Sequence, residues 1–243
     1  MNTNSNTYTV IYTTILVVVV AAVLAVVSSV LKPMQNANVT LEKQKTILRS
    51  ANIEGKDAAS IEALYAKHIT GSFILDLEGN KVEGNAFDVD LKAQFNALKK
   101  GEDAKLPVFI CTLEDGSVLN IFPCYGAGLW GAIWGYVSVE SDFKTVHGAV
   151  FDHASEAPGL GAKIAEAPFY NSFKGKVLAK DGAFNSIQVV KGGANGDPNG
   201  VDAIAGATIT SKALEGAIAQ WLEAYKPYID NELAIIASET VNE

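Results

Sequence analysis

The chain has 243 residues, of which 49% are apolar and 19% are charged, and its formal net charge is −8. This apolar content excludes a disordered acidic tail, and two cysteines are too few for a disulfide-stapled miniature scaffold. The 27 acidic residues outnumber the 19 basic ones, which makes nucleic acid an unfavourable partner.

The N-terminal segment has the composition of a membrane helix. Residues 1–31 contain no charged side chain, and residues 10–31 form an uncharged run of 22 residues. As a helix this run would span roughly 33 Å, close to the apolar thickness of a bilayer, about 30 Å. We therefore expect a tail over 1–9, a transmembrane helix over 10–31 and a polar linker over 32–39. A cleaved signal peptide is the alternative, but it usually has a shorter apolar region behind a positive start.

The charges that follow this run bear on its orientation. Lys32, Lys43, Lys45 and Arg49 all lie after it, so a literal positive-inside count would leave the C-terminal domain in the cytoplasm. Large domains can cross a membrane largely regardless of charge, so composition alone leaves the side open.

Residues 40–243 are predicted to form one α+β domain of short antiparallel strands and peripheral helices. Residues 40–49 have a weakly helical pattern, and residues 57–69 form a clearer helix behind the cap candidates Asp57 and Ser60. Two hairpins follow, over 73–82 and over 108–122, with turns at 78–80 and 115–116. His68 has no second histidine or cysteine nearby at metal-ligand spacing, so no metal site is expected.

The last third of the domain ends in an amphipathic helix. Short strands over 134–139 and 146–151 precede it, and its predicted start is Thr210 or Ser211. Its predicted end is Pro227, because proline lacks the N–H that a helix interior needs. The apolar stripe consists of Leu214, Ala217, Ile218, Trp221, Leu222 and Tyr225.

A two-residue turn at Asp115-Gly116 would place the two cysteines far apart. Cys111 would then lie opposite Asn120, and Cys124 about four residues further along the ladder, or roughly 13 Å away. A disulfide needs Cα atoms within about 7 Å. Two free thiols are therefore predicted.

Residues 126–131 contain the spacing G-x-G-x-x-G of dinucleotide-binding loops. That motif functions between a strand and a helix, whereas here Pro123 interrupts the approach and the exit has the pattern of a strand. We expect instead a tight turn that presents Leu129 and Trp130, either as core residues, which the residue types favour, or as an apolar wall for a flat ligand.

A second glycine-rich loop covers residues 152–163. Its charges could simply be solvated, or its glycines could let the backbone approach a ligand while Glu156 and Lys163 supply polar contacts. Catalysis by His153 and Ser155 is not expected, because Ser155 lacks the context of a nucleophile elbow.

The segment from Asp202 to Ser211 is the most informative. Small residues precede a helix there and leave Thr208 accessible, while Thr210 and Ser211 are cap candidates. The unpaired N–H groups of a helix start favour a phosphate. Composition alone also allows a simple helix cap.

Residues 202–208, Asp-Ala-Ile-Ala-Gly-Ala-Thr, resemble the flavinylation motif D-x-x-[ST]-G-A-T, whose last threonine receives FMN from a flavin transferase. Together with the runs 128–131 and 156–161 and the N-terminal span, the chain is similar to the C subunits of the sodium-translocating NADH:quinone reductases. Ala205 departs from the motif's Ser or Thr, and Ala157 stands where Thr is expected.

The resemblance implies a periplasmic FMN-binding domain on a bacterial inner membrane, with FMN bonded to Thr208 by a phosphoester. It also implies five partner subunits, one of them a second FMN carrier, and a transferase that recognises Asp202, Gly206, Ala207 and Thr208. No catalytic residue, metal, NADH site or quinone site is expected on this chain. The expected FMN contacts are Leu129, Trp130, Gly131, Glu156, Pro158, Gly159, Leu160, Gly161, Lys163, Gly206, Ala207, Thr210 and Ser211.

Three alternatives stay open. The G subunit of the related ferredoxin:NAD electron-transport complex shares the anchor and the acceptor motif, although the Gly-Leu-Trp-Gly run favours the first family. A domain that binds flavin without a covalent bond, or carries none, would fit the departure at Ala205. A stand-alone flavin reductase would turn over by itself with an added donor.

Overall fold

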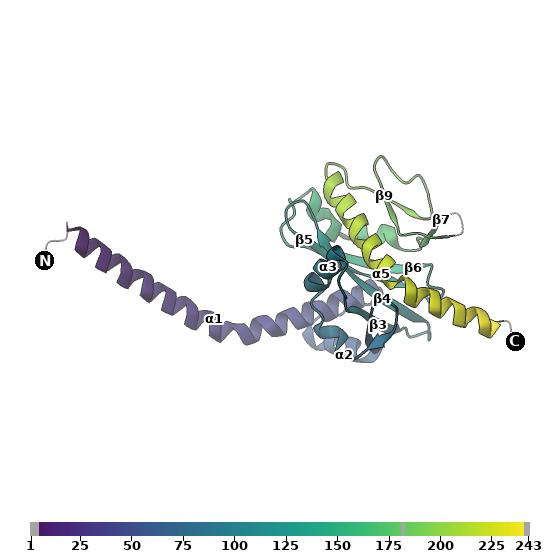
Figure 1. Cartoon of the computed structure of the whole chain (residues 1–243), viewed down its shortest axis with the longest axis horizontal. Helices are drawn as coiled ribbons and strands as arrows, with labels where there is room; N and C mark the ends of the chain where they lie inside the picture. The colour runs from purple at the N-terminus through teal and green to yellow at the C-terminus, as the bar shows by residue number, and fades with distance from the viewer. Residues whose placement is uncertain (1–4, 181–182, 241–243) are drawn as a thin grey trace. The chain divides into compact units, whose positions relative to one another are not determined.

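A computed structural model describes residues 5–180 and 183–240 of the chain. It divides into two compact units, Met1–Lys43 and Gln44–Glu243. Helix α1 (Asn6–Ser50) makes up all but Ser5 of the described part of the first unit and continues into the second (Figure 1). By length and composition it could cross a membrane.

The expected division of the N-terminal region differs from the structure in two places. Residues 6–9 of the expected tail already belong to α1, while residues 1–4 lie outside the described part of the chain. The linker over 32–39 is helical, because α1 continues through Pro33. A proline inside a helix removes one hydrogen bond and favours a bend, but the turns on either side can remain helical.

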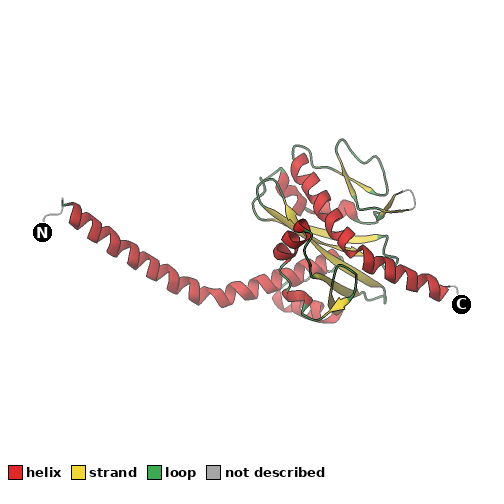
Figure 2. Ribbon diagram, in the orientation of Figure 1, coloured by secondary structure: helices red, strands yellow, loops and turns green. Residues whose placement is uncertain are grey.

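A six-stranded antiparallel sheet with the order β2-β1-β3-β4-β5-β6 is the centre of the second unit (Figure 2). Helices pack around it, as the predicted α+β class requires. The strands are β1 (Ile69–Leu75), β2 (Lys81–Val82), β3 (Leu106–Thr112), β4 (Val118–Ala127), β5 (Ala132–Val139) and β6 (Val146–His153).

Shorter elements complete this unit. Among the described residues, β9 (Gln188–Val190) pairs in parallel with β10 (Gly200–Asp202), and β7 (Ala179–Lys180) pairs with β8 (Ala183–Phe184). The other helices are α2 (Ala58–His68), η1 (Ala86–Asp88), α3 (Leu91–Lys100), η2 (Gly161–Ala165), α4 (Ala167–Tyr170), η3 (Asn171–Phe173) and α5 (Thr208–Thr240).

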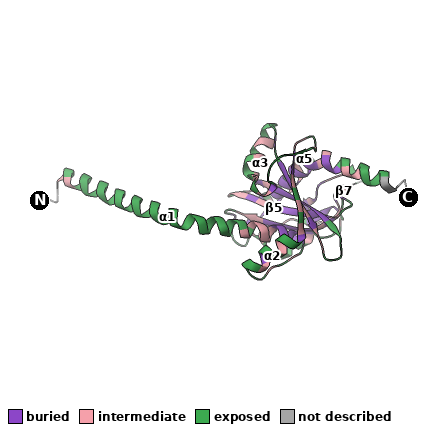
Figure 3. Ribbon diagram, turned by 90° about the horizontal axis from the view of Figure 1, so that it is seen from below, coloured by how far each residue is buried: buried purple, intermediate pink, exposed green. Residues whose placement is uncertain are grey.

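The sheet has an apolar cluster on each face, because side chains alternate along its strands. On one face, Phe122 and Cys124 of β4 belong to the same cluster as Trp221 of α5. On the other, Phe109 of β3 packs in a cluster with Ile47 from the end of α1. Figure 3 shows burial concentrated in the sheet and along α5. The sheet therefore provides a rigid support for the turns at its ends.

Helix α2 confirms its predicted cap. The Asp57 carboxylate accepts from the Ser60 N–H at 2.8 Å, and the Ser60 hydroxyl accepts from the Asp57 N–H at 2.9 Å. This reciprocal pair satisfies two N–H groups that would otherwise be unpaired at the helix start. His68 ends this helix buried, with Nδ1 2.9 Å from the carbonyl oxygen of Thr112.

The hairpin between β3 and β4 differs from the prediction by one residue. Cys111 lies opposite Leu119, because the loop has three residues, with Leu113 N–H donating to Ser117 O and Gly116 in the left-handed region at φ 85°. Both thiols are nevertheless free, as predicted, and both are buried. Burial raises the pKa of Cys111 to about 11 and that of Cys124 to about 12, so both stay protonated at neutral pH.

Helix α5 is longer than the sequence pattern indicates, at both ends. It begins at Thr208 and continues through Pro227 to Thr240. Tyr228 and Ile229, just past the proline, are buried, and the Tyr228 ring lies 5.7 Å from that of Phe73. This packing stabilises the helix beyond the point where local propensity would end it.

Candidate functional site

The hairpin turn between β4 and β5 is the first part of the site. Strand β4 passes through Pro123, which pairs with Tyr136, so the expected interruption at Pro123 is wrong. The turn leads into another strand, β5, as expected, and not into the helix that a dinucleotide fingerprint requires. Gly128 N–H donates to Gly131 O at 2.7 Å and closes the turn.

This turn presents two large apolar side chains to solvent. Leu129 is 46% exposed and Trp130 is 67% exposed, so their interpretation as core residues is wrong. The Ser155 hydroxyl donates to Trp130 O at 2.7 Å, and a Cβ at Gly131 would lie 2.3 Å from that hydroxyl oxygen. The turn lies at the end of β4 and β5, and the Ser155 contact holds it there. The side chains of Leu129 and Trp130 therefore stay outside the core.

Glu156 joins the turn to helix α5. Its side chain is buried, and its Oε1 accepts from the Trp130 N–H at 2.8 Å while its Oε2 accepts from the Thr210 hydroxyl at 2.7 Å. Burial raises the pKa of Glu156, but hydrogen bonds from the Thr210 hydroxyl and from the N–H groups of Trp130, Leu129 and Gly131 lower it below its usual value. Glu156 is therefore a buried carboxylate that stays ionised at neutral pH.

The proline–glycine loop after Glu156 brings an apolar side chain to the start of α5. Gly159 adopts the left-handed conformation at φ 75°, and both Leu160 N–H and Ala162 N–H donate to Ala157 O. Leu160 is 45% exposed, and its Cδ2 would lie 2.9 Å from a Cβ at Gly206. Leu160 thus covers the glycine that precedes Thr208 by two residues.

Thr208 is the first residue of α5 and is half-buried. Gly206 before it has φ 77°, a conformation that glycine adopts without strain. Within the described part of the chain, no carboxylate or imidazole hydrogen-bonds to the Thr208 hydroxyl. The helix starts at the predicted acceptor itself, so its first-turn N–H groups face the same region.

The predicted cap residues of α5 have other roles. Ser211 Oγ accepts from Ile204 N–H at 3.1 Å, and Ser211 N–H donates to Ala207 O at 2.9 Å. Thr210 donates to Glu156. Both side chains lie inside the first helical turn, so they are not N-caps. Both connect the helix to the segments around it.

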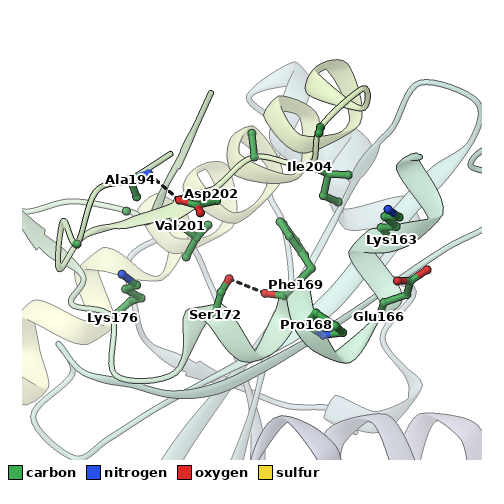
Figure 4. Close-up of a pocket in the computed structure, with 14 residues that line it drawn as sticks. Lys163, Glu166, Pro168, Phe169, Ser172, Lys176, Ala194, Val201, Asp202 and Ile204 are labelled. Atoms are coloured by element: carbon green, nitrogen blue, oxygen red, sulfur yellow. Dashed lines mark hydrogen bonds between the residues drawn. The ribbon is translucent and has the colours of Figure 1, made fainter. Parts of the chain in front are cut away.

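Asp202 lies on a neighbouring cavity of about 550 Å³, shown in Figure 4. Its carboxylate accepts from Ala194 N–H at 2.6 Å. Ile204 lies across the cavity from Ser172 and Pro168 in that view. The lining residues with charged side chains are Lys163, Glu166, Lys176 and Asp202. Thr208, Leu129 and Trp130 do not line it.

The structure thus brings the predicted residues together in two groups. In the first group, the carboxylate of Glu156 is surrounded by Trp130, Gly161 and Thr210. Leu160 covers Gly206, two residues before Thr208. Lys163 and Asp202 lie apart from these, on the cavity. Pro158 is exposed. Sequence reasoning missed the hydroxyl of Ser155 and the cavity residues Phe169 and Lys176, because long-range contacts leave no periodic signal.

Comparisons with known proteins agree on one family. Residues 128–223 match the family model of the FMN-binding domain. The C subunit of the Na(+)-translocating NADH-quinone reductase of Vibrio vulnificus is 32% identical over 207 residues, which cover 79% of this chain and 81% of that protein. The protein of the same name from Neisseria meningitidis is 30% identical over 216 residues, which cover 82% of this chain and 84% of that protein.

Solved structures have the same fold. The crystal structure of the C subunit from Parabacteroides distasonis has a TM-score of 0.73 at 39% identity, and the match covers 82% of this chain and 96% of that one. Shewanella oneidensis NqrC has a TM-score of 0.69 at 29% identity, with 79% and 97% covered. The chain therefore belongs to the family of C subunits of the Na(+)-translocating NADH-quinone reductases, with an FMN-binding domain over residues 128–223.

Proposed function

We propose that this chain is an electron-relaying flavoprotein subunit of a sodium-pumping NADH:quinone oxidoreductase, with FMN bonded to Thr208 by a phosphoester. The position of Thr208 as the first residue of α5, behind the turn at Gly206, carries the proposal. The N–H groups and partial positive charge of a helix start stabilise a phosphate at that position.

Attachment needs a separate enzyme. A threonine hydroxyl is a weak nucleophile without an adjacent base, and the Thr208 hydroxyl has no such partner among the described residues. The transferase would supply the base that takes the hydroxyl proton. Thr208 Oγ then forms a bond to the phosphorus of an activated flavin donor, and the bond between that phosphorus and its leaving phosphate breaks. Asp202, Gly206 and Ala207 would mark the site for the transferase.

The surface beside Thr208 fits a flat, partly apolar group. Leu129, Trp130 and Leu160 expose apolar side chains near the helix start, and Leu160 lies over Gly206. When bound, FMN supplies the redox chemistry. The residues of the chain hold it, exclude water from part of its surface and set its electrostatic environment. The polar edge and phosphate would meet backbone groups of Gly131, Gly159 and Ala207.

This chain would act only within a complex. Electrons would pass from NADH through FAD and an iron–sulfur centre of another subunit to this FMN, and then to further flavins and quinone. The partners would be the other five subunits, including the second FMN carrier. A covalent bond keeps the carrier near these partners at high effective concentration. Sodium would cross through the multi-span partners, because residues 10–31 carry no charged side chain.

Helix α1 would anchor the chain in a bacterial inner membrane, with the second unit in the periplasm. Protease treatment of intact spheroplasts tests this orientation. We expect residues 44–243 to be digested without lysis. If they are protected in intact spheroplasts and digested only after lysis, the domain faces the cytoplasm.

Mass spectrometry tests the covalent bond. The full chain, purified from membranes of cells that contain the transferase, should carry one FMN on the peptide that contains Thr208. Thr208→Val should abolish both the added mass and the fluorescent band in a denaturing gel, whereas Thr208→Ser keeps a hydroxyl and should retain a part of both. An unmodified peptide in the wild-type chain would contradict covalent attachment. Fast turnover by the isolated wild-type chain with an added donor would favour a stand-alone reductase.

A further inference from the structure

The buried carboxylate of Glu156 is the structural centre of the two glycine-rich loops. It contacts the turn at 128–131 through the Trp130 N–H and the first turn of α5 through the Thr210 hydroxyl. Its own backbone N–H donates to Nδ1 of His153 at 3.2 Å. The side chain therefore joins two segments that are far apart in the sequence, and one of them carries Thr208.

The carboxylate of Glu156, and not a ligand, explains why positions 128 and 161 are glycine. A Cβ at Gly128 would lie 2.4 Å from Glu156 Oε1, and a Cβ at Gly161 would lie 2.3 Å from Oε2. Real Cβ atoms do not approach oxygen so closely, so any larger residue would displace the carboxylate. The glycines thus make room for Glu156 inside the protein.

The negative charge of Glu156 has no cationic partner among the described residues. Its hydrogen bonds come from a hydroxyl and from backbone N–H groups, and no ion pair involves it. A buried, unpaired charge keeps its field better than a solvated one. Its Oε2 is hydrogen-bonded to Thr210, which is two residues from Thr208. A flavin at Thr208 would therefore lie close to a fixed negative charge.

Resting on the proposed function, we infer that Glu156 is a positioning residue and not a flavin ligand. Its geometry holds the Leu129–Trp130 turn against the attachment helix, and its charge lowers the reduction potential of the flavin, because reduction adds negative charge beside it. The two effects belong to different properties of one side chain, so two substitutions can separate them.

Glu156→Gln removes the charge and keeps the shape. The amide oxygen can still accept from Trp130 N–H, and the amide nitrogen can donate to Thr210 Oγ. We expect covalent FMN within about twofold of wild type and a flavin midpoint potential that shifts upward. Glu156→Asp keeps the charge but is one methylene shorter, so it cannot reach both partners. We expect its FMN content to fall severalfold.

Controls separate this inference from the proposed function. Glu223→Gln removes an exposed charge from the same helix and should change neither FMN content nor potential. Gly161→Ala should behave like Glu156→Asp, because its methyl group would occupy the space of Oε2. All variants are made in the full chain, with the transferase present, and folding is checked by near-ultraviolet circular dichroism.

The outcomes are distinct. If the wild-type chain carries FMN, and Glu156→Gln leaves the potential unchanged while Glu156→Asp keeps full occupancy, the inference is wrong and the proposed function stands. A wild-type chain without FMN rejects the proposed function instead. If Glu156→Gln does not fold, Thr210→Val and Thr210→Ser replace it. Loss of FMN in the first and rescue in the second would support the positioning role, and equal FMN in both would overturn it.

Discussion

Two sets of large apolar side chains, one within helix α5 and one near its start, differ in exposure. Leu214, Trp221 and Tyr225 in the middle of the helix are at most 1% exposed, whereas Ile209 in its first turn is 61% exposed. Leu129 and Trp130, from the nearby turn, are also exposed. Burial of the first set stabilises the domain, whereas the second set adds little to folding. Exposed apolar groups that gather beside one helix start indicate a surface that serves a ligand or partner.

The buried set should be the more sensitive to truncation. Trp221→Ala would leave a cavity and remove the bond of 2.8 Å from Trp221 Nε1 to Tyr125 O. We expect a loss of about 3 to 5 kcal/mol in the free energy of unfolding, typical of a buried aromatic residue. Urea unfolding of the full chain in detergent measures it. A loss below about 1 kcal/mol would mean that α5 does not pack on the sheet as described.

The turn before Thr208 should give an intermediate effect. Gly206→Ala places a side chain at φ 77°, where its Cβ would lie 2.9 Å from Leu160 Cδ2. We expect a loss of about 1 to 2 kcal/mol in the free energy of unfolding, together with less FMN on Thr208.

Gly216→Ala is the matched control on the same helix. Its Cβ would meet open space, so we expect a gain of about 0.5 to 1 kcal/mol. Equal changes at the two glycines would contradict the strained turn.

Acid should weaken the contacts of Glu156, which joins the turn at 128–131 to the first turn of α5. The folded-state pKa of Glu156 is lowered, so its contribution to stability is present above its unfolded value, about 4.3, and is lost as the pH falls through the folded value. Wild type should therefore lose stability more steeply than Glu156→Gln below about pH 5. Unfolding free energies at several pH values measure the difference, and parallel curves for the two proteins would contradict it.

The same contrast shows what could be predicted from the sequence. The stripe from Leu214 to Tyr225 repeats with helical spacing, so its burial followed from periodicity alone. The ends of α5 did not follow, because packing of Tyr228 past Pro227 overrides local propensity. The resemblance of residues 202–208 to a flavinylation motif was visible because these residues are consecutive. The contact from Glu156 to Thr210 joins residues 54 positions apart, and no local pattern records it.

Truncation of an exposed side chain should have the smallest effect on the free energy of unfolding. It should instead change the signal of the bound flavin. Trp130 is 67% exposed, so we expect Trp130→Ala to change the free energy of unfolding by less than about 0.5 kcal/mol. Its backbone N–H, which binds Glu156, is retained in the variant. If the ring of FMN packs on this side chain, fluorescence of the bound flavin should rise, because indole contact quenches it. Trp134→Ala, on the adjacent strand, is the control for loss of a tryptophan. An unchanged flavin spectrum in Trp130→Ala would place the ring elsewhere, and the cavity beside Asp202 would then be the surface to test next.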